Sequence, residues 1–237
     1  MTADLLRSGA RLTAFEIDRG FSDALEIFFS DEPRFKLVRG DVLKTWEKER
    51  DQTGLPSRFF GNLPYNVAAT MMADFISAGS VFERAVITVQ KEVALRMTAK
   101  VNTSDYSSFT VLCRWAYDVS ALQDLSPSSF WPRPNVDSRA VLMTRKASWS
   151  YEGNTGIFLA AVRALFSSRR KTVLNNYKQW IGSPAFEKAL SSAGVARSAR
   201  HEDGETILRG AGIQPTARAE TLDVDAFLAL SDIIGSI

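Results

Sequence analysis

The spacing of apolar and polar positions along this 237-residue chain changes near residue 147. Before that point, short apolar runs alternate with segments of helical spacing. Strands are expected at 11–17, 36–38, 57–60 and 85–89, and helices at 21–29, 68–77 and 91–98; residues 2–9 have the pattern of the tail of one more helix. This alternation predicts a parallel, doubly wound α/β sheet.

The pattern beyond residue 105 differs in two ways. A helix at 106–115 is followed by strands at 117–125 and 138–145, which a proline-rich loop at 126–134 joins. Such a pair is typical of an antiparallel edge on a parallel sheet. After a linker at 148–154, only helices are expected, at 157–167, 171–180, 185–193 and 224–234. We therefore predict an α/β domain at 1–147 and a small all-α domain at 148–237.

Three polar residues follow predicted strands: Glu16, Asp41 and Asn62. Ligands of doubly wound sheets bind beyond the carboxyl ends of the strands, so these side chains are expected to share one crevice. Glu16 suits the two hydroxyls of a ribose, and Asp41 suits the amino group of an adenine ring, with Val42 packing on the face of that ring. Helix capping by Asp18 and Asp41 is the simpler alternative, and the sequence leaves both open.

The run Asn62-Leu63-Pro64-Tyr65 suits the binding of a flat nitrogen base. An exocyclic amine on a base is a poor nucleophile, because its lone pair is delocalised into the ring. The side-chain oxygen of Asn62 and a backbone carbonyl near Leu63-Pro64 could accept its two hydrogens, while Tyr65 stacks on the ring. Positioning of this kind supplies much of the rate of a transfer reaction. An ordinary strand-to-helix turn is the alternative.

A basic stretch begins in the predicted helical domain. Five lysines and arginines and no acid lie between Arg163 and Lys178, although the formal net charge of the chain is only +2. A run of charge is often a solvated face. Here Arg169, Arg170 and Lys171 are consecutive, so we predict that they follow the phosphates of a nucleic acid.

The composition restricts the other possibilities. The chain is 45% hydrophobic and 24% charged, which is ordinary for a globular protein. Its one cysteine, Cys113, excludes an internal disulfide and fits a reducing cytosol. A single histidine and the lack of a long apolar run argue against a His/Cys metal site and a membrane span. We expect a cytoplasmic monomer that binds neither a metal nor a membrane.

Several of these motifs together resemble one enzyme family. The runs Phe-Gly-Asn-Leu-Pro-Tyr-Asn-Val-Ala (60–68), Val-Asp-Ser (136–138), Phe-Ser-Ser-Arg-Arg-Lys-Thr (166–172) and Arg-Ala-Glu-Thr-Leu (218–222) are similar to the small-subunit ribosomal RNA adenine dimethyltransferases of the kasugamycin-resistance type. The likeness extends from about residue 4 to residue 234. It implies a Rossmann-like class I methyltransferase sheet with S-adenosylmethionine as cofactor. It also implies transfer of two methyl groups to the exocyclic amine of adenines in small-subunit rRNA, within the immature small subunit.

The resemblance also implies roles for individual residues. Asn62, Leu63, Pro64, Tyr65 and Phe130 would form the catalytic site, in which Phe130 stacks on the target adenine opposite Tyr65. A loop anchor is the alternative for Phe130. The cofactor would contact Glu16, Ile17, Asp41, Val42 and Asn62, and the RNA would contact Arg169, Arg170 and Lys171.

The chain departs from that family in its glycines. None of its 14 glycines forms the Gly-x-Gly-x-Gly loop that would approach the methionine part of the cofactor; Gly210-Ala211-Gly212 is the nearest run. The sheet is therefore expected to be N-terminally truncated, with unpaired strand edges and weak or no cofactor binding. Two alternatives follow: a non-catalytic rRNA-binding assembly factor, and a large-subunit rRNA methyltransferase of the macrolide-resistance type. Cofactor affinity separates the first from an enzyme, and the long C-terminal domain argues against the second.

Overall fold

The computed structural model describes the backbone of the whole chain and every side chain except those of Ala199 and Glu202. The chain forms two compact units, Met1–Pro56 and Ser57–Ile237. The predicted domain boundary at 147/148 falls inside the second unit, where it separates the sheet from the helical residues.

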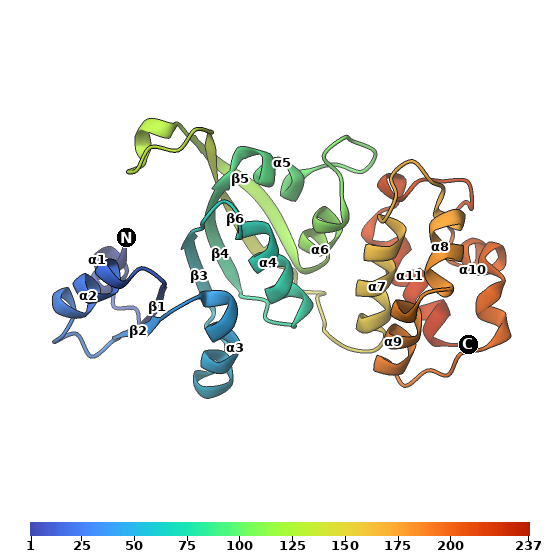
Figure 1. Cartoon of the computed structure of the whole chain (residues 1–237), viewed down its shortest axis with the longest axis horizontal. Helices are drawn as coiled ribbons and strands as arrows, with labels where there is room; N and C mark the ends of the chain where they lie inside the picture. Colours follow the sequence, from blue (N-terminus) through green and yellow to red (C-terminus); the bar gives the residue numbers. More distant parts are fainter. The chain divides into compact units, whose positions relative to one another are not determined.

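The first unit contains a two-stranded parallel sheet and three helices (Figure 1). The elements are α1 (Thr2–Arg7), β1 (Leu12–Glu16), α2 (Arg19–Phe28), β2 (Phe35–Arg39) and α3 (Val42–Thr53). Asp18 accepts a hydrogen bond from the Phe21 amide at 2.9 Å, so α2 begins two residues earlier than its apolar pattern predicts. The sequence did not predict α3, because this mostly polar helix buries only Trp46 and Glu49.

The second unit begins with a four-stranded sheet in the order β3-β4-β6-β5. The strands are β3 (Arg58–Asn62), β4 (Arg84–Gln90), β5 (Tyr117–Leu125) and β6 (Ser138–Arg145). β3 and β4 are parallel, whereas β6 is antiparallel to both β4 and β5, which confirms the predicted antiparallel edge. In the described chain, β1 pairs only with β2 and β3 only with β4, so the expected unpaired strand edges are present.

Three helices lie on one face of this sheet (Figure 1). They are α4 (Ala68–Ser77), α5 (Lys91–Thr98) and α6 (Ser108–Ala116). Ala85, Ile87 and Val89 alternate along β4 and are fully buried, as expected for a strand whose one face is covered. The backbone of α6 begins at Ser108 because Ser107 and Thr110 form a capping box.

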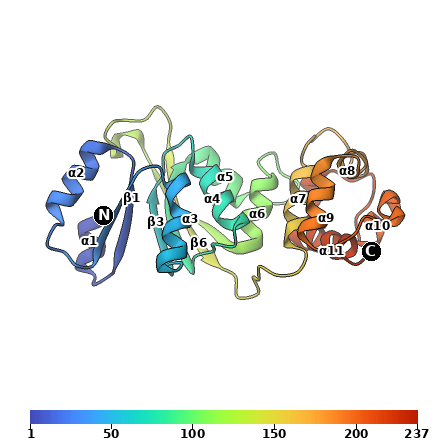
Figure 2. The ribbon, with the colours of Figure 1, turned by 60° about the horizontal axis from the view of Figure 1, so that its bottom comes forward.

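The remaining residues are helical, as predicted, and Figure 2 shows their helices gathered at one end of the second unit. They are α7 (Thr155–Leu165), α8 (Val173–Ile181), α9 (Pro184–Ser192), α10 (Gly204–Gly210) and α11 (Val224–Gly235). Phe158, Phe186 and Phe227 form much of their core. The sequence did not predict α10, because a seven-residue helix that starts and ends with glycine has too short an apolar pattern.

The segment between α5 and α6 joins the sheet to the helical residues. Three hydrogen bonds make this connection: Tyr106 Oη to the Leu222 carbonyl (2.8 Å), the Asn102 amide to the Glu220 carbonyl (2.7 Å), and Arg169 Nη1 to the Ser104 carbonyl (2.8 Å). The Tyr106 side chain is fully buried, and burial raises the pKa of its hydroxyl to about 12. The two parts of the second unit are therefore joined through backbone acceptors, of which the Leu222 carbonyl is buried.

Two features were searched for among the described residues: a membrane-spanning helix and a metal site. Among the described residues, no helix is long and apolar enough to cross a bilayer. In the same residues, no group of three or more His, Cys, Asp or Glu side chains could hold a metal ion.

Candidate active site

The strand register places one edge of the four-stranded sheet at the centre of the site. Asn62 at the end of β3 pairs with Thr88 on β4, and Thr88 pairs with Ala140 on β6. Ser138, the first residue of β6, pairs with Leu125, the last residue of β5. The carboxyl end of β3 and the loop between β5 and β6 therefore meet at the same edge. The sheet itself brings the Asn62 motif and the Phe130 loop together.

The backbone after β3 is tightly packed. The Leu63 amide donates to the Thr88 carbonyl at 3.1 Å, and the Leu63 side chain is buried. A Cβ atom at Gly61 would lie 2.4 Å from Leu63 Cδ2, so only glycine allows this packing. Leu63 therefore holds the motif down, while Asn62 on one side and Pro64 on the other are exposed.

Two acceptors of the motif remain available for a ligand. The Pro64 carbonyl already accepts from the amides of Val67 and Ala68, each at 3.1 Å. In the part of the chain that the structure describes, the Leu63 carbonyl accepts no hydrogen bond, and the side-chain amide of Asn62 neither accepts nor donates one. Of the two carbonyls that the sequence offered, the structure therefore favours that of Leu63. Together with the Asn62 oxygen, it provides two acceptors for the two hydrogens of one amine.

Tyr65 is fixed in place by a residue 73 positions away. Its hydroxyl forms a 2.6 Å hydrogen bond with the Ser138 hydroxyl, and the Ser138 side chain is fully buried. In the sequence, Ser138 stands out only as part of the Val-Asp-Ser motif, and no local pattern predicts this bond. The bond leaves the aromatic ring of Tyr65 half-buried, with its orientation set by the sheet.

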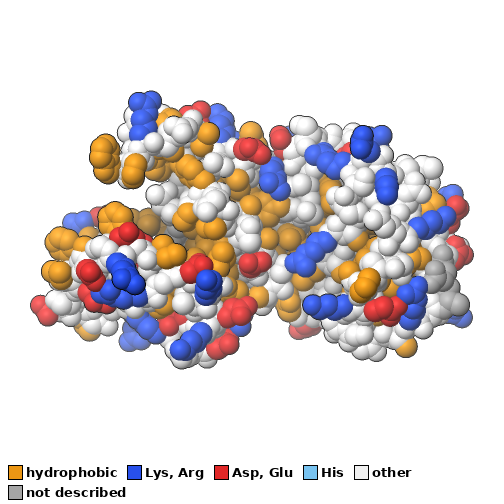
Figure 3. Space-filling view, viewed as in Figure 1, with side chains coloured by type: hydrophobic (Ala, Val, Ile, Leu, Met, Phe, Trp, Pro, Cys, Tyr) orange, Lys and Arg blue, Asp and Glu red, His pale blue; other side chains and the backbone are white. Residues whose placement is uncertain are grey.

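The loop between β5 and β6 carries two adjacent aromatic residues. Phe130 is half-buried, and its neighbour Trp131 is 96% exposed. Figure 3 shows apolar side chains gathered at the tip of this loop, which projects from the sheet in the view of Figure 1. A fully exposed tryptophan is unusual unless a partner covers it. Trp131 was not among the predicted site residues, although two adjacent aromatic residues before a proline are visible in the sequence.

The base of this loop is held by charge. Asp124, near the end of β5, accepts hydrogen bonds from Arg139 and from Lys91, the latter at 2.9 Å. These bonds, that to Arg139 first, hold the pKa of the Asp124 carboxyl well below its usual range. The ion pair between Asp124 and Arg139 thus joins the two strands at the base of the loop, while Trp131 at its tip is exposed.

Four of the five predicted cofactor residues lie in the first unit, and the fifth, Asn62, lies in the second. Glu16 is half-buried, and one of its carboxylate oxygens accepts from the Asp18 amide at 2.9 Å. Ile17 is exposed, and Val42 is the first residue of α3. Asp41 caps α3 by accepting from the Leu43 amide at 3.0 Å, as the capping alternative expected. The same holds for Asp18 at α2.

Capping does not exhaust the acceptors of these carboxylates. Glu16 Oε2 and Asp41 Oδ2 have no hydrogen-bond partner among the described residues. Free carboxylate oxygens at strand ends suit the ribose hydroxyls and the adenine amine of a nucleoside, so these residues fit the nucleoside part of S-adenosylmethionine. The crevice that would combine Glu16 and Asp41 with Asn62 involves both units and stays a prediction.

The three basic residues of the helical part are not equivalent. Arg169 donates to the Ser104 carbonyl, and Lys171 Nζ donates to Gln179 Oε1 at 3.1 Å. Arg170 is exposed and forms neither a hydrogen bond nor an ion pair with any side chain that the structure describes. Its guanidinium group is therefore the most available of the three for a phosphate.

Two solved structures share this fold. A dimethyladenosine transferase from Plasmodium falciparum matches with a TM-score of 0.71 and 24% identity, over 93% of this chain and 80% of that one. The 23S rRNA methyltransferase ErmE matches with a TM-score of 0.59 and 21% identity, over 94% and 81%. These two likenesses show that the chain has the class I methyltransferase fold.

The chain belongs to the ribosomal RNA adenine dimethylase family, which it matches over residues 1–206. It is 40% identical to the ribosomal RNA small subunit methyltransferase A of Treponema denticola, over all of this chain and 77% of that protein. The protein of the same description from Treponema pallidum is 39% identical, over all of this chain and 78% of its own length. That from Clostridium perfringens is 32% identical, over 99% and 76%. The family resemblance read from the motifs is confirmed.

Proposed function

We propose that this protein transfers two methyl groups in succession from S-adenosylmethionine to the exocyclic amine of adenines in small-subunit rRNA. One observation supports this above the others: the free acceptors of Asn62 and Leu63 lie beside a tyrosine that Ser138 holds in place. When bound, the cofactor supplies an electrophilic methyl group on sulfur. The protein has to bind a flipped adenine and make its amine nucleophilic.

The residues of the sheet edge perform this task by position. Asn62 and the Leu63 carbonyl accept the two amine hydrogens, which turns the nitrogen lone pair out of the ring plane and toward the methyl donor. Tyr65 and Phe130 stack on opposite faces of the adenine, and base–aromatic stacking contributes about 1–3 kcal/mol per base. Because the base must leave its helix, a single-stranded loop is the substrate from which extrusion costs least.

Three further parts of the chain complete the proposal. Glu16, Ile17, Asp41 and Val42 hold the nucleoside of the cofactor. Arg170 and Lys171, with Arg169, follow the phosphates of the RNA. Trp131, exposed next to Phe130, stacks on a nucleotide that neighbours the target adenine. A second aromatic platform suits a substrate with two adjacent adenines.

The test is methyl transfer from tritiated S-adenosylmethionine to immature small subunits. Asn62→Ala should lower turnover by about 100- to 1000-fold, the typical cost of losing one preorganised polar contact in a transition state. RNA affinity should change by less than about twofold, because Asn62 orients an amine and does not grip the backbone. Gln214→Ala is the matched control, since it removes an exposed amide from a turn between α10 and α11. Near-normal turnover in Asn62→Ala would show that the assignment is wrong.

Cofactor affinity separates this proposal from the assembly-factor alternative. An assembly factor without cofactor binding would retain its RNA affinity but show no heat of binding for S-adenosylmethionine in calorimetry. Glu16→Ala and Asp41→Ala should each weaken cofactor binding. Neither change should weaken RNA affinity, because a carboxylate repels phosphates and does not attract them.

A further inference from the structure

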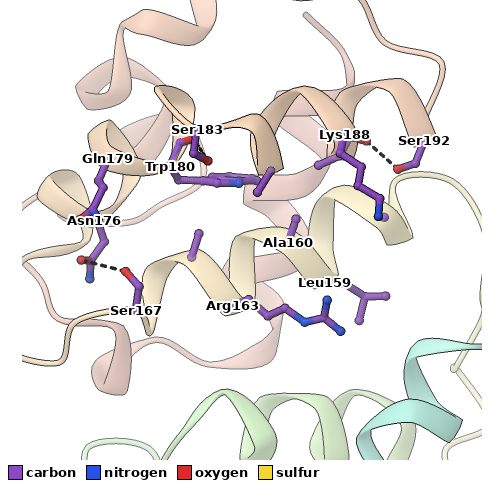
Figure 4. Close-up of a pocket in the computed structure, with 14 residues that line it drawn as sticks. Leu159, Ala160, Arg163, Ser167, Asn176, Gln179, Trp180, Ser183, Lys188 and Ser192 are labelled. Carbon is purple, nitrogen blue, oxygen red and sulfur yellow. Dashed lines mark hydrogen bonds between the residues drawn. The ribbon is translucent and has the colours of Figure 1, made fainter.

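A pocket of about 460 Å³ opens between helices α7, α8 and α9 (Figure 4). Its lining lies within residues 156–192, so none of the residues assigned above to the target base or the cofactor contributes to it. The volume falls in the range of small-molecule sites, which is about 300–1,000 Å³. The pocket is thus large enough for a nucleotide.

The apolar wall of the pocket is built around Trp180. Figure 4 shows its indole ring seen along its edge between α8 and α9, with Ala160 of α7 below it. The ring is 4% exposed and packs edge-on against Phe186, with the two ring centroids 5.0 Å apart. Small side chains at Ala160, Ala164 and Ala189 leave the space in front of it open.

The indole N–H of Trp180 is a buried donor without an acceptor. Nε1 has no hydrogen-bond partner in the described structure, although the side chain is more than nine-tenths buried. Buried polar groups in native proteins are nearly always paired, and each exception calls for an explanation. Trp180 lines the pocket, so an acceptor atom of a bound ligand would supply the missing partner if the indole turned its N–H into the cavity.

The rim of the pocket is positively charged. Arg163 on α7 and Lys188 on α9 are exposed, and neither forms an ion pair or hydrogen bond with a described residue. None of the lining residues that the structure describes is acidic. The nearest acid on α9, Glu187, is itself paired with Arg197. An anionic group at the rim would meet two free cations and no competing carboxylate.

We propose that this pocket binds one unstacked nucleotide of the RNA substrate. The base would lie against the indole and accept from its N–H, and its phosphate would contact Arg163 and Lys188. The proposal rests on the function proposed above, because it assumes an RNA substrate. Arg170 and Lys171 lie in the segment that joins α7 to α8, and both of these helices line the pocket. An RNA strand that contacts the two residues would therefore run near the pocket. The helical part would then recognise an extruded nucleotide and not only the charge of the backbone.

The first experiment observes the Trp180 N–H directly by NMR. The chain has five tryptophans, so few indole signals are present, and Trp180→Phe identifies the one from residue 180. Adenosine 5′-monophosphate should shift this signal downfield at millimolar concentration. Adenosine and inorganic phosphate, which each lack half of the ligand, should shift it at least fivefold less. An unmoved Trp180 signal would overturn the proposal.

The second experiment measures affinity for immature small subunits. Arg163→Ala/Lys188→Ala should lower the slope of log affinity against log salt by about 1.4, at about 0.7 for each lost single-strand phosphate contact. Trp180→Phe, which keeps an aromatic ring, should weaken binding by about 2- to 10-fold, as expected for one hydrogen bond. Arg209→Ala on α10 is the control, because it removes an exposed cation outside the pocket. A salt slope for the double variant equal to that of Arg209→Ala would refute the role of the rim.

The two proposals can fail separately. If methyl transfer occurs but the Trp180 signal ignores the nucleotide, the pocket proposal is wrong and the enzyme assignment stands. If the nucleotide shifts the signal and the double variant loses RNA affinity while no methyl group is transferred, the pocket is correct and the catalytic proposal is wrong. Circular dichroism of each variant checks that the helices are intact.

Discussion

The hydrogen bond between Tyr65 and Ser138 allows a quantitative test of the site. Tyr65→Phe removes the hydroxyl but keeps the ring, and it leaves the buried Ser138 hydroxyl without its 2.6 Å partner. A net hydrogen bond contributes about 0.5–1.5 kcal/mol, and an unsatisfied buried hydroxyl costs about 1–3 kcal/mol. We therefore expect Tyr65→Phe to lower the free energy of unfolding by about 1–2 kcal/mol. Ser138→Ala should cost less, because the half-buried tyrosine hydroxyl can be hydrated.

The double variant separates this bond from other effects. Since Tyr65→Phe/Ser138→Ala removes both partners, its loss of stability should be about 0.5–1.5 kcal/mol smaller than the sum of the single losses. Urea unfolding measures all four free energies. Additive losses would show that the two hydroxyls do not interact, and the account of how Tyr65 is positioned would be wrong.

The turnover of the same variants in the methyl-transfer assay gives a second test. Tyr65→Phe keeps the stacking ring, so its turnover should fall by no more than about tenfold, which corresponds to about 1.4 kcal/mol of lost positioning. Tyr65→Ala also loses stacking worth about 1–3 kcal/mol and should show a larger loss. The control is Tyr151→Phe. Tyr151 lies between β6 and α7, and its hydroxyl donates a 2.6 Å hydrogen bond to the carbonyl of Ser77, the last residue of α4. This substitution should leave turnover unchanged.

Four further predictions concern other parts of the second unit. Arg170→Ala should reduce the salt slope of RNA binding by about 0.7–0.9 without changing urea unfolding, whereas Arg169→Ala should also destabilise the fold because it loses a backbone acceptor. Trp131→Ala should weaken RNA binding by about 1–3 kcal/mol in an anisotropy titration and leave the melting temperature unchanged, as its side chain is 96% exposed. Cys113 is fully buried, which raises the pKa of its thiol, so a thiol reagent at pH 8 should modify it only after unfolding. Burial raises the pKa of Tyr106 from 10.0 to about 12. The stability that its neutral form contributes is therefore present below pH 10 and is lost as the pH rises toward 12. Tyr106→Phe should remove that part of the loss of stability at alkaline pH.

Local patterns were sufficient to predict most of the fold. The helix at 68–77 and the strands at 117–125 and 138–145 have the predicted bounds, because apolar residues recur there with a clear period. The misses have one physical cause. The helix α3 buries few side chains and α10 is only seven residues long, so neither carries an apolar stripe that is long enough to indicate a helix.

The site was predictable in its motifs and not in its contacts. Asn62 and Tyr65 belong to one contiguous run, so residue order alone indicated their chemistry. The bond from Tyr65 to Ser138 and that from Arg169 to Ser104 join residues 73 and 65 positions apart. Only the folded sheet and helices bring such pairs together, and no local pattern encodes them.

Because of the hydrogen bonds at the α5–α6 segment, the helical residues after 147 cannot simply be replaced by those of a relative. A cut at the predicted boundary of 147/148 would free the Tyr106 hydroxyl and the Asn102 amide from their acceptors at Leu222 and Glu220. A chimaera that grafts a foreign helical part onto this sheet would therefore need to bring its matching α5–α6 segment as well. The part of the chain that must be exchanged together is thus discontinuous in sequence: it combines the residues after 147 with the α5–α6 segment.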